Sequence, residues 1–336
     1  MIDVLVVGAG PAGLATAMYA AAAGLEVTVL DSRDGPIDKA CGEGLMPGAL
    51  PILARWGVDP IGMPLRGVSY RSATAHADHR FRSGTGRGVR RLELHRAMTA
   101  RAEELGVERV SAKVDALQSD AAGVTAAGIR GSFLVGADGL HSSVRRLAGL
   151  EGTPSRGRRY GLRRHYRIAP WSDHIEVHWS PRVEAYVTPV APDEVGIAML
   201  GPQRTDFDEA LAEIPELRDR LADVAPASSL RGAGPLRQTA LAPSRGRVLL
   251  VGDASGYVDA ITGEGLRLGF AQARAAIASI TGGPAYDGEW RRVTRDFRVL
   301  TDGLVRAAGT PARRAIVPAA RALPWLYGGI VERLAR

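Results

Sequence analysis

The sequence predicts an α/β protein in which a Rossmann-like dinucleotide-binding domain is interleaved with an antiparallel β-sheet domain and followed by a C-terminal helical segment. Three observations predict this fold class. A strand, turn, helix and strand occupy residues 3–31, two further apolar strands run into aspartate-containing turns at 133–146 and 247–265, and short strands fill 160–200. Strands that alternate with helices predict a parallel sheet, whereas consecutive short strands predict an antiparallel one.

The opening stretch has the layout that a dinucleotide requires. An apolar strand leads into Gly8-Ala9-Gly10-Pro11-Ala12-Gly13, and an alanine-rich helix follows to about residue 23. Glycines in this spacing permit the tight turn, the approach of a pyrophosphate and close packing of helix on strand. The start of the helix then directs N–H groups at the phosphates. The second strand ends at an acidic residue suited to a ribose hydroxyl. The predicted contacts in this stretch are Gly8, Gly10, Ala12, Gly13, Asp31, Ser32 and Arg33.

Two later stretches distinguish a flavin from a nicotinamide cofactor. The run Asp138-Gly139…Ser142…Arg145 in FLVGADGLHSSVRR resembles the DG motif of the para-hydroxybenzoate hydroxylase superfamily of flavoproteins. Gly252-Asp253 in RVLLVGDASGYVDAITGEG resembles the GD motif of that superfamily, and residues 90–107 resemble its R-x-x-L helix. The resemblance covers residues 3 to about 280 and implies a glutathione-reductase-type domain with bound FAD. The further FAD contacts that it implies are Cys41, Arg91, Asp138, Gly252, Asp253, Gly263, Gly265 and Leu266.

We expect the domains to be interleaved along the chain. The expected FAD-binding domain comprises residues 1–64, 90–156 and 241–284. The expected substrate domain comprises 65–89 and 157–240, and C-terminal helices comprise 285–336. A single helix is expected near 206–223. Prolines at 311, 318 and 324 are expected to divide the tail into short helices.

If successive strands of the substrate sheet pair about assumed hairpin turns, the pairing predicts which residues share each face of the sheet. One face is expected to carry Tyr166, Val177, Trp179, Glu184, Tyr186 and Ala198, and the other His165, His178, Val187, Ile197 and Met199. A slip of one residue in register would exchange the faces.

Residues 184–189, EAYVTP, stand where the superfamily's geranylgeranyl reductases carry Y-x-W-x-F-P and its halogenases W-x-W-x-I-P. The resemblance implies that Glu184, Tyr186 and Thr188 face a substrate cavity, with Trp179 nearby. We take Glu184 and Tyr186 as candidate catalytic residues and Tyr186, Thr188 and Trp179 as candidate substrate contacts. Ordinary packing stays open for each of them. The missing halogenase tryptophans argue against halogenation.

Cys41 is the third candidate catalytic residue. Its loop, Cys41-Gly42-Glu43-Gly44, and the stretch 262–266, TGEGL, resemble geranylgeranyl reductases more than aromatic hydroxylases. A loop that follows the second strand lies near the flavin in such a fold, so the thiol is expected beside the isoalloxazine ring or the substrate. The alternative is a small buried apolar side chain.

Composition excludes several classes of function. One cysteine forms no disulfide framework, and the histidines lack metal-binding spacing, so no metal site is predicted. The N-terminus has no cleavable leader and no apolar run reaches the length of a membrane span, so we expect a cytoplasmic protein. The net charge of +7 resides in residues 291–336, where ten arginines face three acidic residues. No aromatic-interleaved basic patch accompanies it, so we expect no nucleic-acid partner.

The tail has two interpretations. It is either a helical cap with arginines in solvent or a peripheral contact with an anionic membrane.

The resemblance implies an FAD-dependent oxidoreductase. The first expectation is a monooxygenase that hydroxylates a lipophilic aromatic or polyketide-type small molecule through a C4a-hydroperoxyflavin, with NADPH or NADH as electron donor. The cofactor carries this chemistry, so no acid–base dyad is required. The alternative is reduction of isoprenoid C=C bonds, as in geranylgeranyl reductases. A halogenase or a non-enzymatic flavin-binding protein has less support. The substrate and the oligomeric state are not predicted.

Overall fold

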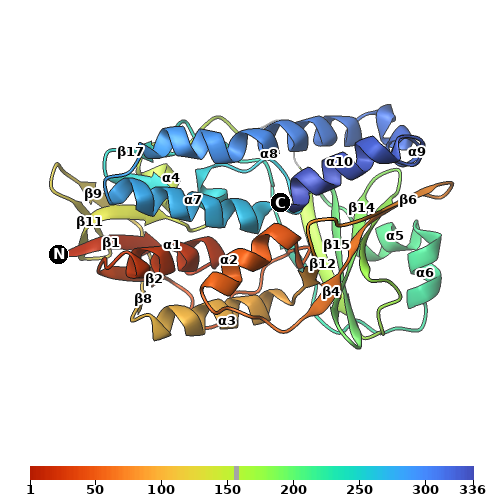
Figure 1. Cartoon of the computed structure of the whole chain (residues 1–336), viewed down its shortest axis with the longest axis horizontal. Coiled ribbons are helices and arrows are strands. Elements are labelled where there is room, and N and C mark those ends of the chain that lie inside the picture. The colour runs from red at the N-terminus through yellow and green to blue at the C-terminus, as the bar shows by residue number, and fades with distance from the viewer. Residues whose placement is uncertain (155–158) are drawn as a thin grey trace.

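A parallel sheet at one end of the molecule and a mostly antiparallel sheet at the other are bridged by long helices (Figure 1). The structure is a computed structural model that describes residues 1–154 and 159–336. The expected domain boundary at 156–157 lies outside the described residues.

The first sheet has five parallel strands in the order β18-β11-β1-β2-β8. These strands are β1 (Ile2–Val7), β2 (Val27–Asp31), β8 (Glu108–Ser111), β11 (Ile129–Gly136) and β18 (Val248–Leu250). Three short strands join this sheet through antiparallel pairing: β9 (Leu117–Ser119), β10 (Val124–Ala126) and β17 (Ser244–Arg245). All of β2 and the last four residues of β1 are buried, because helices or loops cover both faces of the sheet.

Three helices cover this sheet near the expected dinucleotide site. They are α1 (Pro11–Ala22), α3 (Arg91–Glu104) and α7 (Gly265–Ile280), with α1 packed between the other two. The helix α1 starts with proline, whose missing N–H costs nothing at that position, and it ends before Gly24 at a φ of 76°. Short helices complete the domain: η1 (Pro47–Ala49), α2 (Leu50–Arg55), α4 (Ser143–Leu147) and η2 (Gly252–Ser255).

The second sheet has the order β16-β12-β15-β14-β13-β5-β6 and is antiparallel except between β13 and β5. Its strands are β5 (Gly67–Arg71), β6 (His76–Arg80), β12 (Arg159–Tyr166), β13 (His174–Trp179), β14 (Glu184–Ala191), β15 (Glu194–Pro202) and β16 (Arg231–Ala233). A small third sheet joins β3 (Gly44–Leu45), β7 (Gly86–Gly88) and β4 (Met63–Leu65). The parallel pair refines the expected all-antiparallel sheet, and the predicted fold class is confirmed.

The expected faces are correct for β13, β14 and β15 and wrong for β12. Tyr186 pairs with Ala198, which pairs with Arg163, so His165 shares the face of Tyr186. Tyr166 lies on the opposite face. The cause is strand order: β12 pairs with β15 rather than with the next strand, so a hairpin centre between β12 and β13 does not set its register.

Helices also correct two expectations. The single helix expected near 206–223 is divided into α5 (Phe207–Ala212) and α6 (Pro215–Leu221), because proline starts a new helix at 215. The tail begins with one long helix, α8 (Tyr286–Ala308), along the upper edge of Figure 1. The segments η3 (Pro311–Ala315), α9 (Ile316–Ala322) and α10 (Pro324–Ala335) follow, and Pro318 is tolerated in the first turn of α9. Within the described ranges no helix is long and apolar enough to span a bilayer.

Candidate active site

A cavity of about 300 Å³ lies where the two sheets meet. Its polar end is formed by loops that follow the parallel strands and by the start of α3. The residues there include Gly10, Lys39, Cys41, Arg91, Asp253 and Gly263. Its apolar end lies between the second sheet and α10. The residues there include Val68, Val177, Ala198, Leu236, Val331 and Leu334.

The glycines of the turn between β1 and α1 have different roles: some permit close packing, and one borders the cavity. A Cβ on Gly13 would lie 1.8 Å from the carbonyl oxygen of Gly8, so the helix α1 packs directly on the turn. A Cβ on Gly10 would meet nothing within 4 Å, because this residue borders the cavity. Ala12 also lines the cavity, at the N-terminus of α1. The open side of this turn therefore fits a pyrophosphate at a helix N-terminus.

His95 holds the same turn from α3. Its Nε2 lies 2.9 Å from the carbonyl oxygen of Ala9, and Thr99 lies 3.4 Å from its Nδ1. Burial lowers the pKa of His95, so the neutral imidazole is favoured and Nε2–H donates to Ala9. The sequence analysis missed this residue, although it lies four positions after Arg91, on the same face of the helix.

Asp31 ends β2 as expected, but its acceptor sites are occupied. Its carboxylate accepts hydrogen bonds from Ala9 N at 2.8 Å, from Arg33 N at 3.0 Å and from the Arg33 guanidinium. Burial opposes ionisation, but hydrogen bonds from Arg33 and Ala9 lower the pKa of Asp31 below its ordinary value. A separate pocket of about 200 Å³ opens beside Asp31 and Arg33, while Ser32 is exposed. A ribose that binds Asp31 there must displace the Arg33 side chain.

The two aspartate motifs have different structural positions. Asp253 lines the cavity, and within the described ranges its carboxylate accepts no hydrogen bond from protein. Burial raises the pKa of Asp253, while Lys39, Arg91 and Arg145 oppose the rise. This free acceptor fits a hydroxyl of a ribityl chain.

Asp138 is not among the residues that line the cavity, although its neighbours Ala137 and Gly139 are, and its expected role as an FAD contact stays a prediction. Its carboxylate accepts from the Ser142 hydroxyl at 2.5 Å and from Val144 N at 3.1 Å, at the start of α4. The buried Arg145 connects the two motifs, because its guanidinium donates to the carbonyl oxygens of Leu140 and Ala254. The DG motif therefore stabilises the turns around the site.

The start of α7 supplies a second helix N-terminus. Gly263, Gly265 and Leu266 line the cavity as expected. Gly263 has a φ of 71°, and a Cβ there would meet nothing within 4 Å. The residue before the helix, Glu264, makes no side-chain cap within the described residues, so N–H groups at this end are free for a ligand. Gly252 has a φ of 60° and borders the same end of the cavity.

Two cations complete the polar end. Burial lowers the pKa of Lys39, as do the nearby Arg33 and Arg91, while Asp253 opposes the effect. The Nε of Arg91 is buried without a hydrogen-bond partner in the described part of the chain. Two helix N-termini, a free carboxylate and these cations fit the phosphates, ribityl chain and flavin edge of an FAD molecule.

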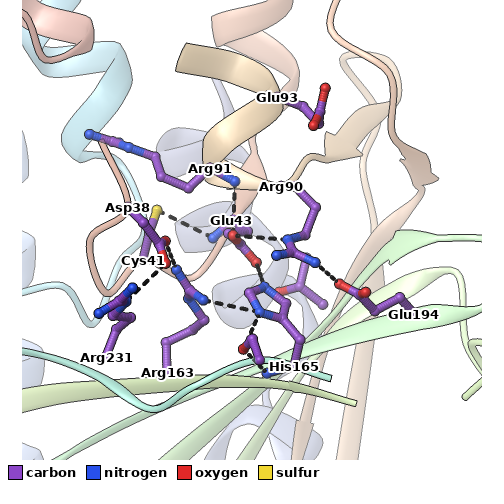
Figure 2. A network of polar contacts seen from close by, with 12 residues as sticks. Asp38, Cys41, Glu43, Arg90, Arg91, Glu93, Arg163, His165, Glu194 and Arg231 are labelled. Carbon is purple, nitrogen blue, oxygen red and sulfur yellow. Dashed lines mark hydrogen bonds and ion pairs between the residues drawn. The ribbon is translucent and has the colours of Figure 1, made fainter. Parts of the chain in front are cut away.

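Glu43 connects the Cys41 loop to α3 (Figure 2). It is buried and has a φ of 58°, a left-handed conformation that costs free energy in any residue but glycine. Its Oε1 accepts from Arg91 N at 2.8 Å and so caps a helix whose own N-cap residue, Arg90, has no acceptor in its side chain. Cys41 lines the cavity, and its Sγ lies 3.4 Å from Glu43 N.

His165 connects the same loop to the second sheet (Figure 2). Its Nε2 lies 2.5 Å from Glu43 Oε2, and its Nδ1 lies 3.0 Å from a guanidinium nitrogen of Arg163. Because a guanidinium only donates, Nδ1 accepts and the proton lies on Nε2, facing Glu43. Ser228 lies 2.9 Å from the same Nδ1, and Arg163 also contacts Asp38.

The loop is thus held at both ends by β12. The sequence analysis assigned no role to Glu43, Arg163 or His165. Arg163 and His165 share the face of Tyr186, but this face depends on the pairing of β12 with β15, which the sequence does not show.

Of the predicted substrate-strand residues, only Tyr186 lines the cavity. Its hydroxyl donates to the carbonyl oxygen of Ile261 at 3.1 Å, and burial raises the pKa of Tyr186 well above its ordinary value. Thr188 does not line the cavity and donates to the carbonyl oxygen of Gly42 at 2.8 Å. Trp179 packs 5.6 Å from the ring of Tyr70, also outside the lining.

Glu184 likewise lies outside the cavity lining, and its expected catalytic role stays a prediction. It is fully buried and forms ion pairs with Arg159 at 2.5 Å and with Arg313 of η3. Arg159 in turn lies 3.0 Å from Asp259. Glu184 and Tyr186 are about 7 Å apart along the strand. Glu184 therefore contacts Arg313 in the C-terminal segment, whereas Tyr186 borders the cavity.

Comparison with known proteins identifies the cofactor class. A family model described as an FAD binding domain matches residues 1–281. The chain belongs to this family. It is an FAD-dependent oxidoreductase of the para-hydroxybenzoate hydroxylase and geranylgeranyl reductase superfamily, as the sequence predicted, and the predicted FAD is confirmed at the level of the family.

Relatives of this flavoprotein are named for more than one reaction. It is 32% identical over 325 residues to a menaquinone reductase of Mycolicibacterium smegmatis, across 85% of this chain and 78% of the relative. It is 26% identical to digeranylgeranylglycerophospholipid reductase 1 of Methanothermobacter thermautotrophicus, across 88% and 82%. It is 28% identical to a 12-dehydrotetracycline 5-monooxygenase/anhydrotetracycline 6-monooxygenase of Streptomyces rimosus, across 81% and 61%.

A solved flavoprotein/dehydrogenase from Cytophaga hutchinsonii superposes on this flavoprotein with a TM-score of 0.81. The match covers 99% of this chain and 96% of that one, at 18% identity. This likeness shows the fold.

Proposed function

We propose that this flavoprotein reduces a carbon–carbon double bond in a lipophilic polyprenyl-type substrate, with NADPH or NADH as the source of electrons. The observation that carries the proposal is one continuous cavity with Cys41 at its polar end and an apolar wall at its other end. Menaquinone and digeranylgeranyl phospholipid, for which two relatives are named, both carry polyprenyl chains.

The two ends of the cavity have separate tasks in this proposal. FAD bound at the polar end, once reduced by NADPH or NADH, would supply a hydride to one carbon of the double bond. The Sγ–H of Cys41 gives a proton to the other carbon, and the resulting thiolate recovers a proton from water. Glu43 fixes the loop that carries Cys41. Its carboxylate accepts hydrogen bonds from Arg91 N and from His165 Nε2–H, so it has a positioning role in this proposal.

The apolar end binds and orients the chain of the substrate. Val68, Val177 and Leu236 border it from the second sheet and its flank, and Val331 and Leu334 border it from α10. Apolar walls bind an isoprenoid through burial of its surface and keep water away from the reacting carbons.

Hydroxylation of a lipophilic aromatic or polyketide-type molecule is the second candidate. Two relatives named as monooxygenases favour it: the tetracycline enzyme above and a rifampicin monooxygenase of Rhodococcus hoagii that matches 44% of this chain. The same cavity serves both reactions, because oxygen chemistry is a property of the cofactor. The two candidates differ in their need for O₂ and for a proton donor at Cys41.

Replacement of Cys41 tests the first proposal. We expect Cys41→Ala to bind FAD as the wild type does and to lose product formation from a geranylgeranyl or menaquinone substrate by at least about a hundredfold, the usual contribution of a general acid. Cys41→Ser should retain intermediate activity. Unchanged turnover in Cys41→Ala would exclude the thiol as the proton donor.

A further inference from the structure

The helix α10 has two apolar faces, and only one of them is covered. Tyr327, Val331 and Leu334 face inward and are buried, and the last two line the cavity. The Tyr327 hydroxyl donates to the carbonyl oxygen of Val68 at 3.0 Å, which fixes the helix on the second sheet. The inner face of α10 therefore forms part of the wall at the apolar end of the cavity.

The outer face of α10 carries large exposed apolar side chains. Trp325 is 72% exposed, Leu326 is 43% exposed, and Leu323 and Ile330 are exposed to a similar degree as Leu326. Leu326 and Ile330 lie four residues apart on one side of α10, Leu323 immediately precedes the helix, and Trp325 lies about 100° around the helix from Leu326. Isolated exposed apolar residues are common, but four large ones between positions 323 and 330 form an apolar stripe of the kind that marks an interaction surface.

The charges around this stripe are basic. Arg321 precedes it, and Arg333 and Arg336 continue it toward the end of the chain, all three exposed. The acidic residue of α10, Glu332, is turned away and paired with His79 at 2.8 Å. Arg333 pairs with Asp296 of α8 but keeps 60% of its side chain exposed.

We propose that this surface, Leu323, Trp325, Leu326 and Ile330 with Arg321, Arg333 and Arg336, docks on an anionic lipid bilayer. Charge complementarity favours anionic head groups, and each basic residue near such a surface contributes to binding at low salt. Tryptophan and leucine insert at the boundary between head groups and acyl chains. The benefit of a membrane-dissolved substrate rests on the proposed function, whereas the docking itself rests on this surface.

Vesicle sedimentation tests the docking. The purified oxidised holoprotein is mixed with phosphatidylcholine vesicles, with and without phosphatidylglycerol, at low and high salt. We expect binding that requires phosphatidylglycerol and weakens with salt. The double variant Trp325→Ser/Leu326→Ser should lower the partition coefficient at least about tenfold, because two large apolar side chains leave the interface. Arg321→Gln should lower it about fivefold at low salt.

A matched control uses Ile61, which is 84% exposed and lies outside this surface. Ile61→Ser should bind vesicles as the wild type does. Binding that ignores phosphatidylglycerol, or that survives the double substitution, overturns the proposal. So does a wild-type dimer in sedimentation velocity that the double substitution dissociates, since a second copy then covers the surface.

Activity separates this proposal from the proposed function. Turnover of a short-chain substrate in detergent does not require a bilayer. Failed docking with intact turnover overturns the docking alone, and intact docking without reduction overturns the reductase alone.

Discussion

The carboxylate of Glu43 and the imidazole of His165 meet at 2.5 Å in the interior, where both side chains are buried. This contact joins the loop that carries Cys41 to the second sheet, and the other oxygen of Glu43 caps α3. Glu43 therefore contributes to fixing the flavin end and the substrate end of the cavity relative to each other, together with the contacts of Arg163 with Asp38 and of Thr188 with Gly42.

Replacing Glu43 by glutamine tests whether Glu43 accepts the hydrogen bond from His165 Nε2–H. The amide oxygen can still accept from Arg91 N, but its NH₂ group then faces the Nε2–H of His165. The other imidazole tautomer offers no relief, because Nδ1–H would face Arg163. A buried unsatisfied donor costs about 1–3 kcal/mol, so we expect a lower melting temperature and faster FAD loss.

The control for Glu43→Gln is Glu93→Gln, on the exposed surface of the same helix (Figure 2). It should change the free energy of unfolding by less than about 0.5 kcal/mol. Equal stability and FAD retention in both variants would show that the buried contact does not hold the loop.

Alanine substitutions of Asp253 and Asp138 should have different effects, the first on FAD binding and the second on the free energy of unfolding. Asp253→Ala removes a free acceptor in the cavity, so the purified protein should lose FAD absorbance. Its apoprotein should not be destabilised, because burial already disfavours this carboxylate. Asp138→Ala removes the acceptor of Val144 N and of the Ser142 hydroxyl at the start of α4 and should lower stability by about 1–2 kcal/mol while FAD is retained. Loss of FAD in both variants at equal stability would support the expected contact of Asp138 with FAD.

Glu184 and Tyr186, two residues apart on β14, should also behave differently. Glu184→Gln leaves Arg159 and Arg313 without their shared carboxylate, so the free energy of unfolding should fall by about 3–5 kcal/mol. Tyr186→Phe should fold normally and change only the kinetics with substrate. Urea unfolding and steady-state kinetics measure both. A stable Glu184→Gln variant with impaired kcat would support the catalytic role expected from the sequence.

His95 should make stability depend on pH. Burial lowers its pKa in the folded state, so the unfolded state binds the proton more readily and stability falls as pH falls below about 6.5. His95→Gln keeps a donor for the Ala9 carbonyl oxygen without titrating. The stability of the wild type relative to this variant should therefore decrease between pH 7.5 and pH 5 in urea unfolding. A constant difference would mean that His95 does not change protonation on unfolding in this range.

Local patterns predicted the parallel sheet and the helix starts, because glycine spacing and apolar runs act within a few residues of one another. Gly10 was found this way and Asp253 and Gly263 through the resemblance to the flavoprotein superfamily, and all three border the cavity. The face of His165 could not be predicted, because β12 pairs with β15 across thirty residues of intervening chain.

Charged residues were harder to place than glycines. A sequence does not show that Glu184 meets Arg313, since the pair joins segments that are 129 residues apart. Asp138 was assigned to FAD on motif alone, yet Ser142 and Val144 within the same motif occupy its oxygens. In both cases the partners of the carboxylate decide its role, and only the folded chain brings those partners together.

A single turnover without oxygen tests the proposed reductase most directly. The holoprotein is reduced anaerobically, mixed with a geranylgeranyl or menaquinone substrate, and the product is analysed by mass spectrometry. The proposal predicts a product that has gained two hydrogen atoms in the absence of O₂, and loss of this product in Cys41→Ala. Unchanged substrate under anaerobic conditions, with one oxygen atom gained when O₂ is admitted, would contradict reduction and establish hydroxylation.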